Sequence, residues 1–294
     1  MSVAVLIAAV LLGYRWSTRR GPSARRTQPS SPILQTFPST LAPGIHILGR
    51  LSPGVAYAVE TAEGLALIDS GLAADSASLI EQLRELGLDV SWLRIILLTH
   101  AHGDHSLGAR RLRELSGAKI YAGKDDSPPL RAGAPREAIF ANYDMTGFPI
   151  HSTPVDVELS GGEVIELGPT RFQAIATPGH TPGSMCYLLK RDDLTALFAG
   201  DTVMSMSELG TYSAYLAPRY RGDAQACLRS CRKLLAVPVP DLLLPGHPHN
   251  APEPPSARLT QQQWQGLLEA GIQEMETLVA RYQTDGPDFL DGNL

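Results

Sequence analysis

Short apolar segments separated by turn-forming residues dominate the chain from residue 45 onward. Segments of strand length stand between Gly, Pro, Ser or charged residues. The predicted strands cover residues 45–48, 55–59, 65–68, 95–98, 118–121, 163–167, 171–176, 185–190, 194–199 and 241–244. Apolar residues with helical spacing predict helices over residues 74–86, 106–115, 224–235 and 257–282. Two groups of strands, each followed by helices, predict an α/β fold with four αββα layers, in which two mixed sheets face each other.

The stretch 123–154 interrupts this pattern. It is rich in Pro and Gly and carries scattered apolar residues, among them Phe140, Tyr143 and Phe148. Long irregular loops in compact domains usually serve a function or are disordered. One hypothesis is that the stretch forms an apolar wall that selects the organic part of a substrate. The other is that it packs on the surface as a partly helical insertion.

The N-terminus has a different composition from the rest of the chain. Residues 3–12 are unbroken apolar, five arginines follow by residue 26, and the first thirty residues contain no acid. The apolar run is shorter than the twenty or so residues of a membrane span. A signal peptide, however, would carry its basic residues before the run, whereas here they follow it. Residues 1–20 are therefore expected to be a membrane anchor, with a cleaved export signal or a disordered leader as alternatives. Residues 21–43, rich in Pro, Ser and Arg, predict a linker, and residues 44–294 the catalytic domain.

Length and charge narrow the class of substrate. A chain of 294 residues with 44% apolar composition can build a substantial core as one large or two small domains. The net charge is −5, and without the five N-terminal arginines the remaining residues carry about −10. Nucleic-acid phosphates demand a basic surface, so this acidic chain is not expected to bind nucleic acid. The expected partner is a small-molecule substrate.

The cysteines indicate neither a disulfide framework nor a metal ligand. Their number is three, which is odd. Cys227 and Cys231 stand four residues apart on one predicted helix, so they share a face and are expected in the core. Cys186 lies in a predicted strand and is expected to be buried.

A dense group of metal-binding side chains directly follows the predicted strand 95–98. The sequence from Thr99 to His105 contains three imidazoles and a carboxylate, namely His100, His102, Asp104 and His105. Alternation along an extended backbone places the first three on one side, and a turn at Gly103 lets His105 rejoin them. Imidazole and carboxylate groups at this density predict a metal site at the end of a strand.

Three further candidate ligands occupy the same kind of position. His180, Asp201 and His247 each follow a strand-like segment and a glycine. Strand ends hold ligands rigidly, because the sheet fixes the backbone and the loop needs to supply only one side chain.

These seven residues, in this order, resemble the ligand set of the metallo-β-lactamase superfamily, and the likeness covers roughly residues 41–265. The resemblance implies the αββα fold and one metal held by His100, His102 and His180. A second metal would be held by Asp104, His105 and His247, with Asp201 bridging both. Asp69 matches the acidic residue that the family places behind its metal-binding loop, where it would accept a hydrogen bond that orients a ligand. The alternative for Asp69 is a turn residue before Gly71.

This ligand chemistry favours two Zn²⁺ ions, with Fe or Mn as alternatives. A metal-bridging hydroxide, available because metal lowers the pKa of water to about 7, would attack a polarised carbonyl. Asp104 is the candidate that orients this nucleophile and takes its proton. The expected substrates are thioesters, lactones, β-lactams or related small esters and amides.

Individual branches of the family fit less closely. The segment Thr177–Gly183 resembles glyoxalase-II-like thioesterases, but only about 45 residues follow His247, fewer than their longer helical C-terminal region. Lactonases carry a Tyr where this chain has Met204, and Tyr212 and Tyr215 are candidates for its substrate-binding role. An alternative on the same fold is a mononuclear iron persulfide dioxygenase, which about one iron per chain and oxygen consumption would distinguish from a zinc hydrolase.

Overall fold

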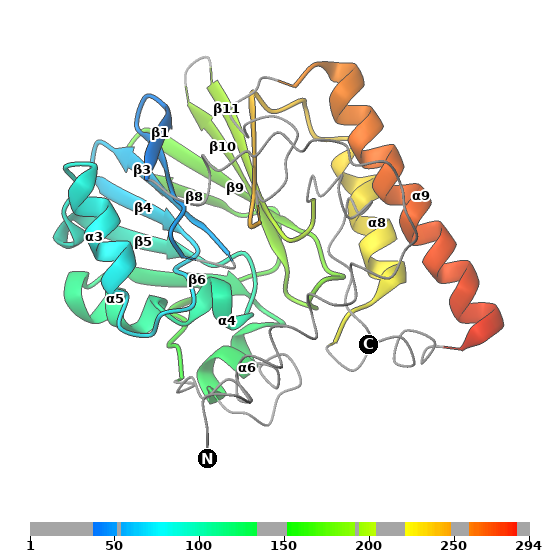
Figure 1. The fold of residues 1–294 in the computed structure, drawn as a ribbon, viewed down its shortest axis with the longest axis horizontal. Coiled ribbons are helices and arrows are strands. Elements are labelled where there is room, and N and C mark those ends of the chain that lie inside the picture. Colours follow the sequence, from blue (N-terminus) through cyan, green and yellow to red (C-terminus); the bar gives the residue numbers. More distant parts are fainter. Residues whose placement is uncertain are drawn as a thin grey trace, which may run out of the picture.

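The computed structural model describes residues 38–51, 54–133, 152–191, 194–203, 221–247 and 259–286, and in these residues two β-sheets face each other (Figure 1). The first sheet has the strand order β1-β2-β3-β4-β5-β6-β7. Its strands are β1 (Ser39–Ala42), β2 (Ile45–Leu48), β3 (Ala56–Thr61), β4 (Gly64–Ile68), β5 (Leu93–Leu97), β6 (Lys119–Gly123) and β7 (Val157–Leu159). Pairing is antiparallel from β1 to β4 and parallel from β4 to β7.

The second sheet has the order β12-β11-β10-β9-β8. Its strands are β8 (Val164–Leu167), β9 (Thr170–Ala176), β10 (Met185–Arg191), β11 (Leu194–Gly200) and β12 (Leu242–Pro245). Pairing is antiparallel from β8 to β11 and parallel between β11 and β12. Both sheets are therefore mixed, and β9, β11 and β12 all end at the same edge of the second sheet.

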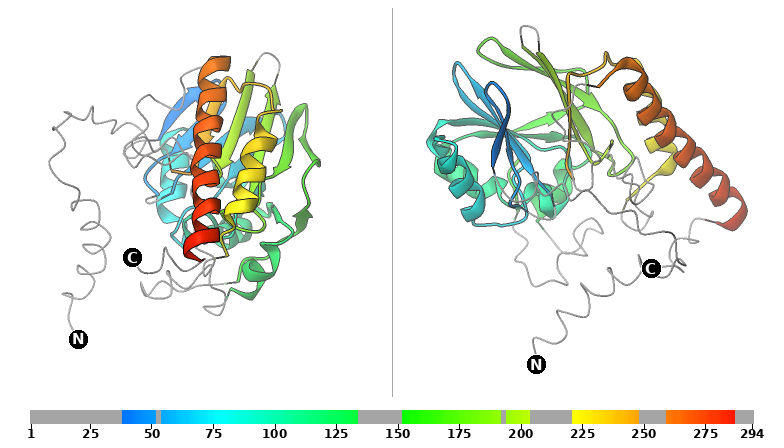
Figure 2. Two further views of the ribbon diagram at one scale, coloured as in Figure 1. Left: turned by 90° about the vertical axis from the view of Figure 1, so that its right-hand side faces the viewer. Right: turned by 45° about the horizontal axis from the view of Figure 1, so that its top comes forward.

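Helices cover the outer face of each sheet. Beside the first sheet lie α3 (Ala77–Glu85), the short 3₁₀ helix η2 (Val90–Trp92) and α5 (Ala109–Ser116), and beside the second lie α8 (Ala224–Leu234) and α9 (Gln261–Asp285). The left view of Figure 2 shows α8 and α9 side by side. Two shorter helices, α4 (Gly103–Ser106) and α6 (Ser127–Ala132), lie at the lower end in Figure 1. The predicted αββα sandwich is confirmed.

Alternation along the strands builds three apolar layers. On β10, Met185, Tyr187 and Leu189 face the core between the sheets, whereas Cys186 and Leu188 face α8 and α9. The strands of the first sheet divide in the same way between the central core and the layer under α3 and α5. Because both faces of each sheet are covered, the central strands are almost continuously apolar, which is why they stand out in the sequence.

The structure differs from the predictions at several short elements. Strand β1 lies inside the range 21–43 predicted as a linker, because its backbone pairs with β2, so the folded unit begins before residue 44. Strand β7 has only three residues, too few to show alternation. The helix predicted over 106–115 corresponds to α5, which begins only at Ala109, and a separate short helix, α4, ends at Ser106. A Cβ on Gly108 between them would lie 2.4 Å from the Ser70 carbonyl oxygen, so the chain must be glycine there.

Several predictions lie outside the described residues. These are the N-terminal segment 1–20, most of the linker, the aromatic part of the stretch 123–154, and both Tyr212 and Tyr215. In the part of the chain that the structure describes, no helix is both long and apolar enough to cross a membrane. Cys186, Cys227 and Cys231 are buried, as predicted, and form no disulfide bond.

Candidate metal centre

All four segments that carry candidate ligands converge at one end of the sandwich. His100 follows β5 of the first sheet, whereas His180, Asp201 and His247 follow β9, β11 and β12 of the second. Backbone hydrogen bonds join these strand ends: the Met185 N–H donates to the Thr99 carbonyl at 2.8 Å, and the Gly246 N–H donates to the Gly200 carbonyl at 2.8 Å. Seven side chains scattered over 148 positions of the sequence are therefore brought together by the sheets.

Two buried tyrosines link the sheets close to the ligands. Tyr57 on β3 donates to the Pro245 carbonyl at 2.6 Å, two residues before His247. Tyr187 on β10 donates to the Leu98 carbonyl at 2.7 Å, two residues before His100. Each sheet thus supplies a hydroxyl that fixes the ligand-bearing strand end of the other sheet.

The short helix α4 carries two ligands of the first motif, Asp104 and His105, and His102 directly precedes it. His102 has an extended backbone, with φ −60° and ψ 146°, and the helix begins at the next residue, Gly103. Ser70 holds the helix in place, because its N–H and its hydroxyl both donate to the His105 carbonyl, at 2.7 and 2.9 Å. The turn predicted at Gly103 therefore occurs, and it brings His105 back toward His100.

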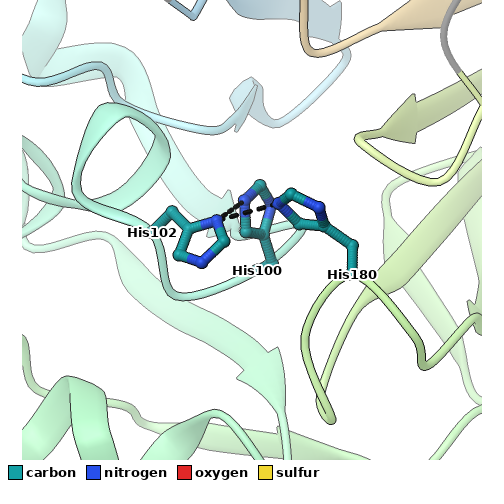
Figure 3. A group of neighbouring side chains, drawn as sticks. All are labelled: His100, His102 and His180. Atoms are coloured by element: carbon teal, nitrogen blue, oxygen red, sulfur yellow. Dashed lines mark hydrogen bonds between the residues drawn. The ribbon is translucent and has the colours of Figure 1, made fainter. Parts of the chain in front are cut away.

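Three imidazoles form the first cluster, which we call the trihistidine half (Figure 3). His102 Nδ1 lies 2.9 Å from His100 Nε2 and 2.8 Å from His180 Nε2. All three side chains are buried. Three nitrogens that point at one another from two loops form a ready set of ligands for a single divalent cation.

Asp104, His105 and His247 form the second cluster, which we call the mixed half. His247 Nε2 lies 3.2 Å from His105 Nε2 and 3.2 Å from Asp104 Oδ2. Gly246 precedes His247, and a Cβ there would lie 2.5 Å from Asp201 Oδ1 and 2.7 Å from a His105 ring carbon, so only glycine fits.

Asp201 lies between the two halves. Its Oδ2 is 3.3 Å from His180 Nε2 and 3.3 Å from His247 Nε2, and its Oδ1 is 3.5 Å from His105 Nε2. This position is the one that a carboxylate bridging two cations would need.

Asp69 supports ligands of both halves from behind. Its Oδ2 lies 2.9 Å from His105 Nδ1, and its two oxygens accept the backbone N–H and the hydroxyl of Thr99, at 2.7 and 2.8 Å. The Thr99 hydroxyl oxygen in turn lies 3.1 Å from His100 Nδ1. With its proton on Nδ1, each ring would present Nε2 to the site. Asp69 has a left-handed backbone with φ 60°, a strained conformation for a non-glycine residue.

The two halves differ in charge. Burial, reinforced by the neighbouring His180, lowers the pKa of His102 to about 3, and burial with the neighbouring histidines also holds the pKa of His100 well below its ordinary value. Burial opposes protonation of His247 as well, but Asp201 and Asp104 outweigh it and raise the pKa of His247 to about 10. The trihistidine half therefore presents neutral imidazoles.

The donor set fits divalent cations. Asp201 Oδ1 is buried and has no hydrogen-bond partner in the described part of the chain, an arrangement that costs free energy unless a ligand is bound there. Neutral imidazole nitrogens and carboxylate oxygens are the ligands that zinc, iron and manganese accept. The described ligands contain no sulfur, and the three cysteines lie elsewhere in the core.

One buried acid in this region was missed in the sequence. Asp126 is fully buried and accepts hydrogen bonds from the loops that carry His100 and His180. It lies in the stretch 123–154, predicted to be irregular. The signal was present: Asp126 precedes Ser127 and two prolines, and proline in the first turn is typical of a helix start.

Comparison with known proteins agrees with this geometry. Residues 49–247 match the family model of the metallo-beta-lactamase superfamily. Hydroxyacylglutathione hydrolase of Cereibacter sphaeroides (strain ATCC 17023) is 28% identical over 177 residues, which are 60% of this chain and 56% of that protein. The chain therefore matches little more than half the length of that relative. Uncharacterized protein YobT of Bacillus subtilis (strain 168) is 32% identical over 210 residues, which are 67% of this chain and 84% of that protein.

Solved structures with the same fold include two β-lactamases. BJP-1, a subclass B3 metallo-beta-lactamase of Bradyrhizobium japonicum, has a TM-score of 0.68 and 24% identity, covering 85% of this chain and 96% of that chain. Native FEZ-1 metallo-beta-lactamase from Legionella gormanii also has a TM-score of 0.68, with 22% identity, covering 85% of this chain and 98% of that chain. At these identities the likeness concerns the fold.

Proposed function

The chain belongs to the metallo-β-lactamase superfamily, and from this premise we propose that it is a binuclear zinc-dependent hydrolase of small molecules with an activated carbonyl group. The observation that carries the proposal is the position of Asp201 between two clusters of three ligand residues each. One cluster alone would suit a mononuclear site, whereas two clusters that share a carboxylate suit a pair of cations.

When bound, the two cations would supply Lewis acidity that polarises a carbonyl and lowers the pKa of a water molecule to about 7. His100, His102 and His180 would hold one cation, and Asp104, His105 and His247 the other. The neutral trihistidine half contributes no charge of its own, so only the shared Asp201 carboxylate would offset the attraction of a cation held there for an oxyanion.

Asp104 is the proposed proton acceptor. Its carboxylate is buried, and its Oδ2 faces His247 at 3.2 Å and His105 at 3.5 Å. The neighbouring histidines overcome the effect of burial and hold the pKa of Asp104 well below its ordinary value, so the group is ionised at neutral pH. An ionised carboxylate at this position can orient a water molecule and accept its proton.

Thioesters are the first substrates to test, with lactones, β-lactams and related esters and amides next. Support for thioesters comes from the similarity to hydroxyacylglutathione hydrolase, and support for β-lactams only from the shared fold. All these substrates pass through one tetrahedral oxyanion, which the same metal pair would stabilise.

The test is a panel of thioester, lactone, β-lactam and phosphoester substrates, assayed with the full-length chain after zinc loading, and the metal content is quantified beforehand in the chain as purified. The proposal predicts about two zinc ions per chain and hydrolysis of at least one carbonyl substrate, lost in His102→Ala. About one iron per chain with oxygen uptake would contradict it, and so would hydrolysis that survives His102→Ala.

A further inference from the structure

A buried carboxylate outside the ligand set connects the two loops of the trihistidine half. Asp126 directly precedes helix α6 and lies on neither β5 nor β9, the strands that precede the three histidines. Its Oδ2 accepts the Ala101 N–H at 2.9 Å and the Thr181 hydroxyl at 2.6 Å, and its Oδ1 accepts the Gly183 N–H at 2.9 Å. Ala101 stands between His100 and His102, and Thr181 directly follows His180. One side chain thus contacts the immediate neighbours of all three histidines.

The packing around Asp126 leaves little freedom for the two loops to shift. A Cβ on Gly183 would lie 2.4 Å from the Asp126 backbone nitrogen and 2.7 Å from its Cβ. A Cβ on Gly123 would lie 1.9 Å from the Gly183 carbonyl oxygen. The His180 loop is therefore in backbone contact with the segment that carries Asp126, and its distance from His100 and His102 depends on that contact.

Folding alone does not explain an acid at this position. Burial raises the pKa of Asp126 even though three hydrogen bonds and the charge of Arg221 act in the opposite direction. A carboxyl group whose pKa is higher in the folded than in the unfolded state reduces stability at neutral pH. What the carboxylate offers instead is two oxygens that accept three donors from two loops at once.

We propose that Asp126 is a positioning residue for the trihistidine half. Through its hydrogen bonds to the two loops that carry these histidines, Asp126 fixes His180 at the correct separation from His100 and His102. This inference rests on the proposed function only in that the trihistidine half binds a divalent cation. It assigns Asp126 no contact with substrate or metal. Asp69 has the corresponding task at the mixed half, where it contacts the His105 ring directly.

The test compares Asp126→Asn with Asp125→Asn in the full-length chain. The two variants make the same change at adjacent positions, but Asp125 is exposed. An amide has only one acceptor oxygen, so the Asp126→Asn side chain loses either the Gly183 N–H or the Ala101 and Thr181 donors. Zinc affinity is measured by competition with a chromophoric chelator, and ligand geometry by the visible absorption spectrum of the cobalt-loaded protein.

We expect Asp126→Asn to weaken the binding of one of two zinc ions by about 10- to 100-fold and to change the cobalt spectrum. Asp125→Asn should match the unaltered chain in both measurements. Circular dichroism of the metal-free variant should show a folded protein. Unaltered zinc affinity and an unaltered cobalt spectrum in Asp126→Asn would overturn the proposal.

A second pair of variants covers the case in which Asp126→Asn does not fold. Thr181→Val removes the hydroxyl that donates to Asp126, whereas Thr181→Ser keeps it. The proposal predicts weaker zinc binding in Thr181→Val and recovery in Thr181→Ser, and equal affinities in the two variants would contradict it. Because these readouts measure metal binding, they stand even if no carbonyl substrate is hydrolysed, so failure of the proposed function is distinguishable from failure of this inference.

Discussion

The two halves of the metal centre are built from similar residues but differ in charge and in support. The trihistidine half consists of neutral imidazoles, with the pKa of His102 lowered to about 3. The mixed half combines a carboxylate with His247, whose pKa is raised to about 10. Asp126 supports the first half through the backbone and a hydroxyl of its loops, whereas Asp69 contacts a ring of the second half.

This difference shows how one end of the αββα sandwich can form two metal-binding sites that differ in charge. The imidazoles of the trihistidine half are neutral, so a cation that binds there does not have to deprotonate an imidazolium ring first. The mixed half in its metal-free form holds protons between imidazoles and carboxylates, so a cation there must replace them. We therefore expect the two sites to fill with different dependence on pH.

The largest effect should follow from removing one ligand in each half. His102→Ala and His247→Ala should each reduce the zinc content by about one ion per chain and lower kcat by at least about 10²- to 10³-fold. Metal analysis and hydrolysis assays measure both effects. If one variant retained two zinc ions and full activity, its half would not be part of the site.

A smaller effect is expected from Asp69→Asn. This change weakens the contact with His105 Nδ1 while leaving all seven ligands in place. Loss of such a supporting carboxylate should reduce zinc affinity by about 10- to 100-fold. Competition with a chelator measures the zinc affinity. If the affinity of Asp69→Asn equalled that of the unaltered chain, Asp69 would serve only as a turn residue before Gly71.

The cross-sheet hydroxyls should affect stability more than chemistry. Tyr57→Phe removes the hydroxyl that donates to the Pro245 carbonyl near the mixed half, and Tyr187→Phe removes the hydroxyl that donates to the Leu98 carbonyl near the trihistidine half. Each change should lower the free energy of unfolding of the metal-free protein by about 1–3 kcal/mol, measured by urea denaturation. If the free energy of unfolding of a variant equalled that of the unaltered chain, the hydroxyl removed in that variant would not connect the sheets in solution.

The remaining effects concern pH, and the two halves should respond in opposite directions. The raised pKa of His247 stabilises the metal-free fold at low pH, and this contribution should be lost as pH rises from 6.5 to about 10. The lowered pKa of His102 makes the fold lose stability as pH falls from 6.5 to about 3.

Denaturation curves of the metal-free protein across this pH range test the assignment. The stability difference between the unaltered chain and His247→Gln should shrink toward pH 10, and His102→Gln should lose less stability on acidification than the unaltered chain. The same pH profile in both variants would contradict the difference between the halves.

The sequence predicts the strands and the ligand set better than it predicts the supports. The central strands are visible because their apolar runs are continuous, and His100, His180 and His247 follow them within four residues. Pairing with β2 makes a strand of Ser39–Ala42, a tertiary effect that no local pattern carries. The prolines after Asp126 indicate the start of a helix but not the role of its side chain, because that role depends on loops that come from elsewhere in the chain.

The position of Asp69 was predictable only through the family resemblance. A single acid before a glycine is typical of a turn, and nothing local indicates that it contacts Thr99 and His105, thirty or more residues away. The same holds for Tyr57 and Tyr187, whose hydroxyl partners belong to the opposite sheet.

The most direct test of the central claim is an anomalous difference map, recorded at the zinc edge, from crystals of the zinc-loaded chain. The account predicts two peaks, one at about 2.0–2.1 Å from nitrogens of His100, His102 and His180 and one beside Asp104, His105 and His247, with Asp201 between them. No peak at this end of the sandwich, or a peak bound by other residues, would contradict it.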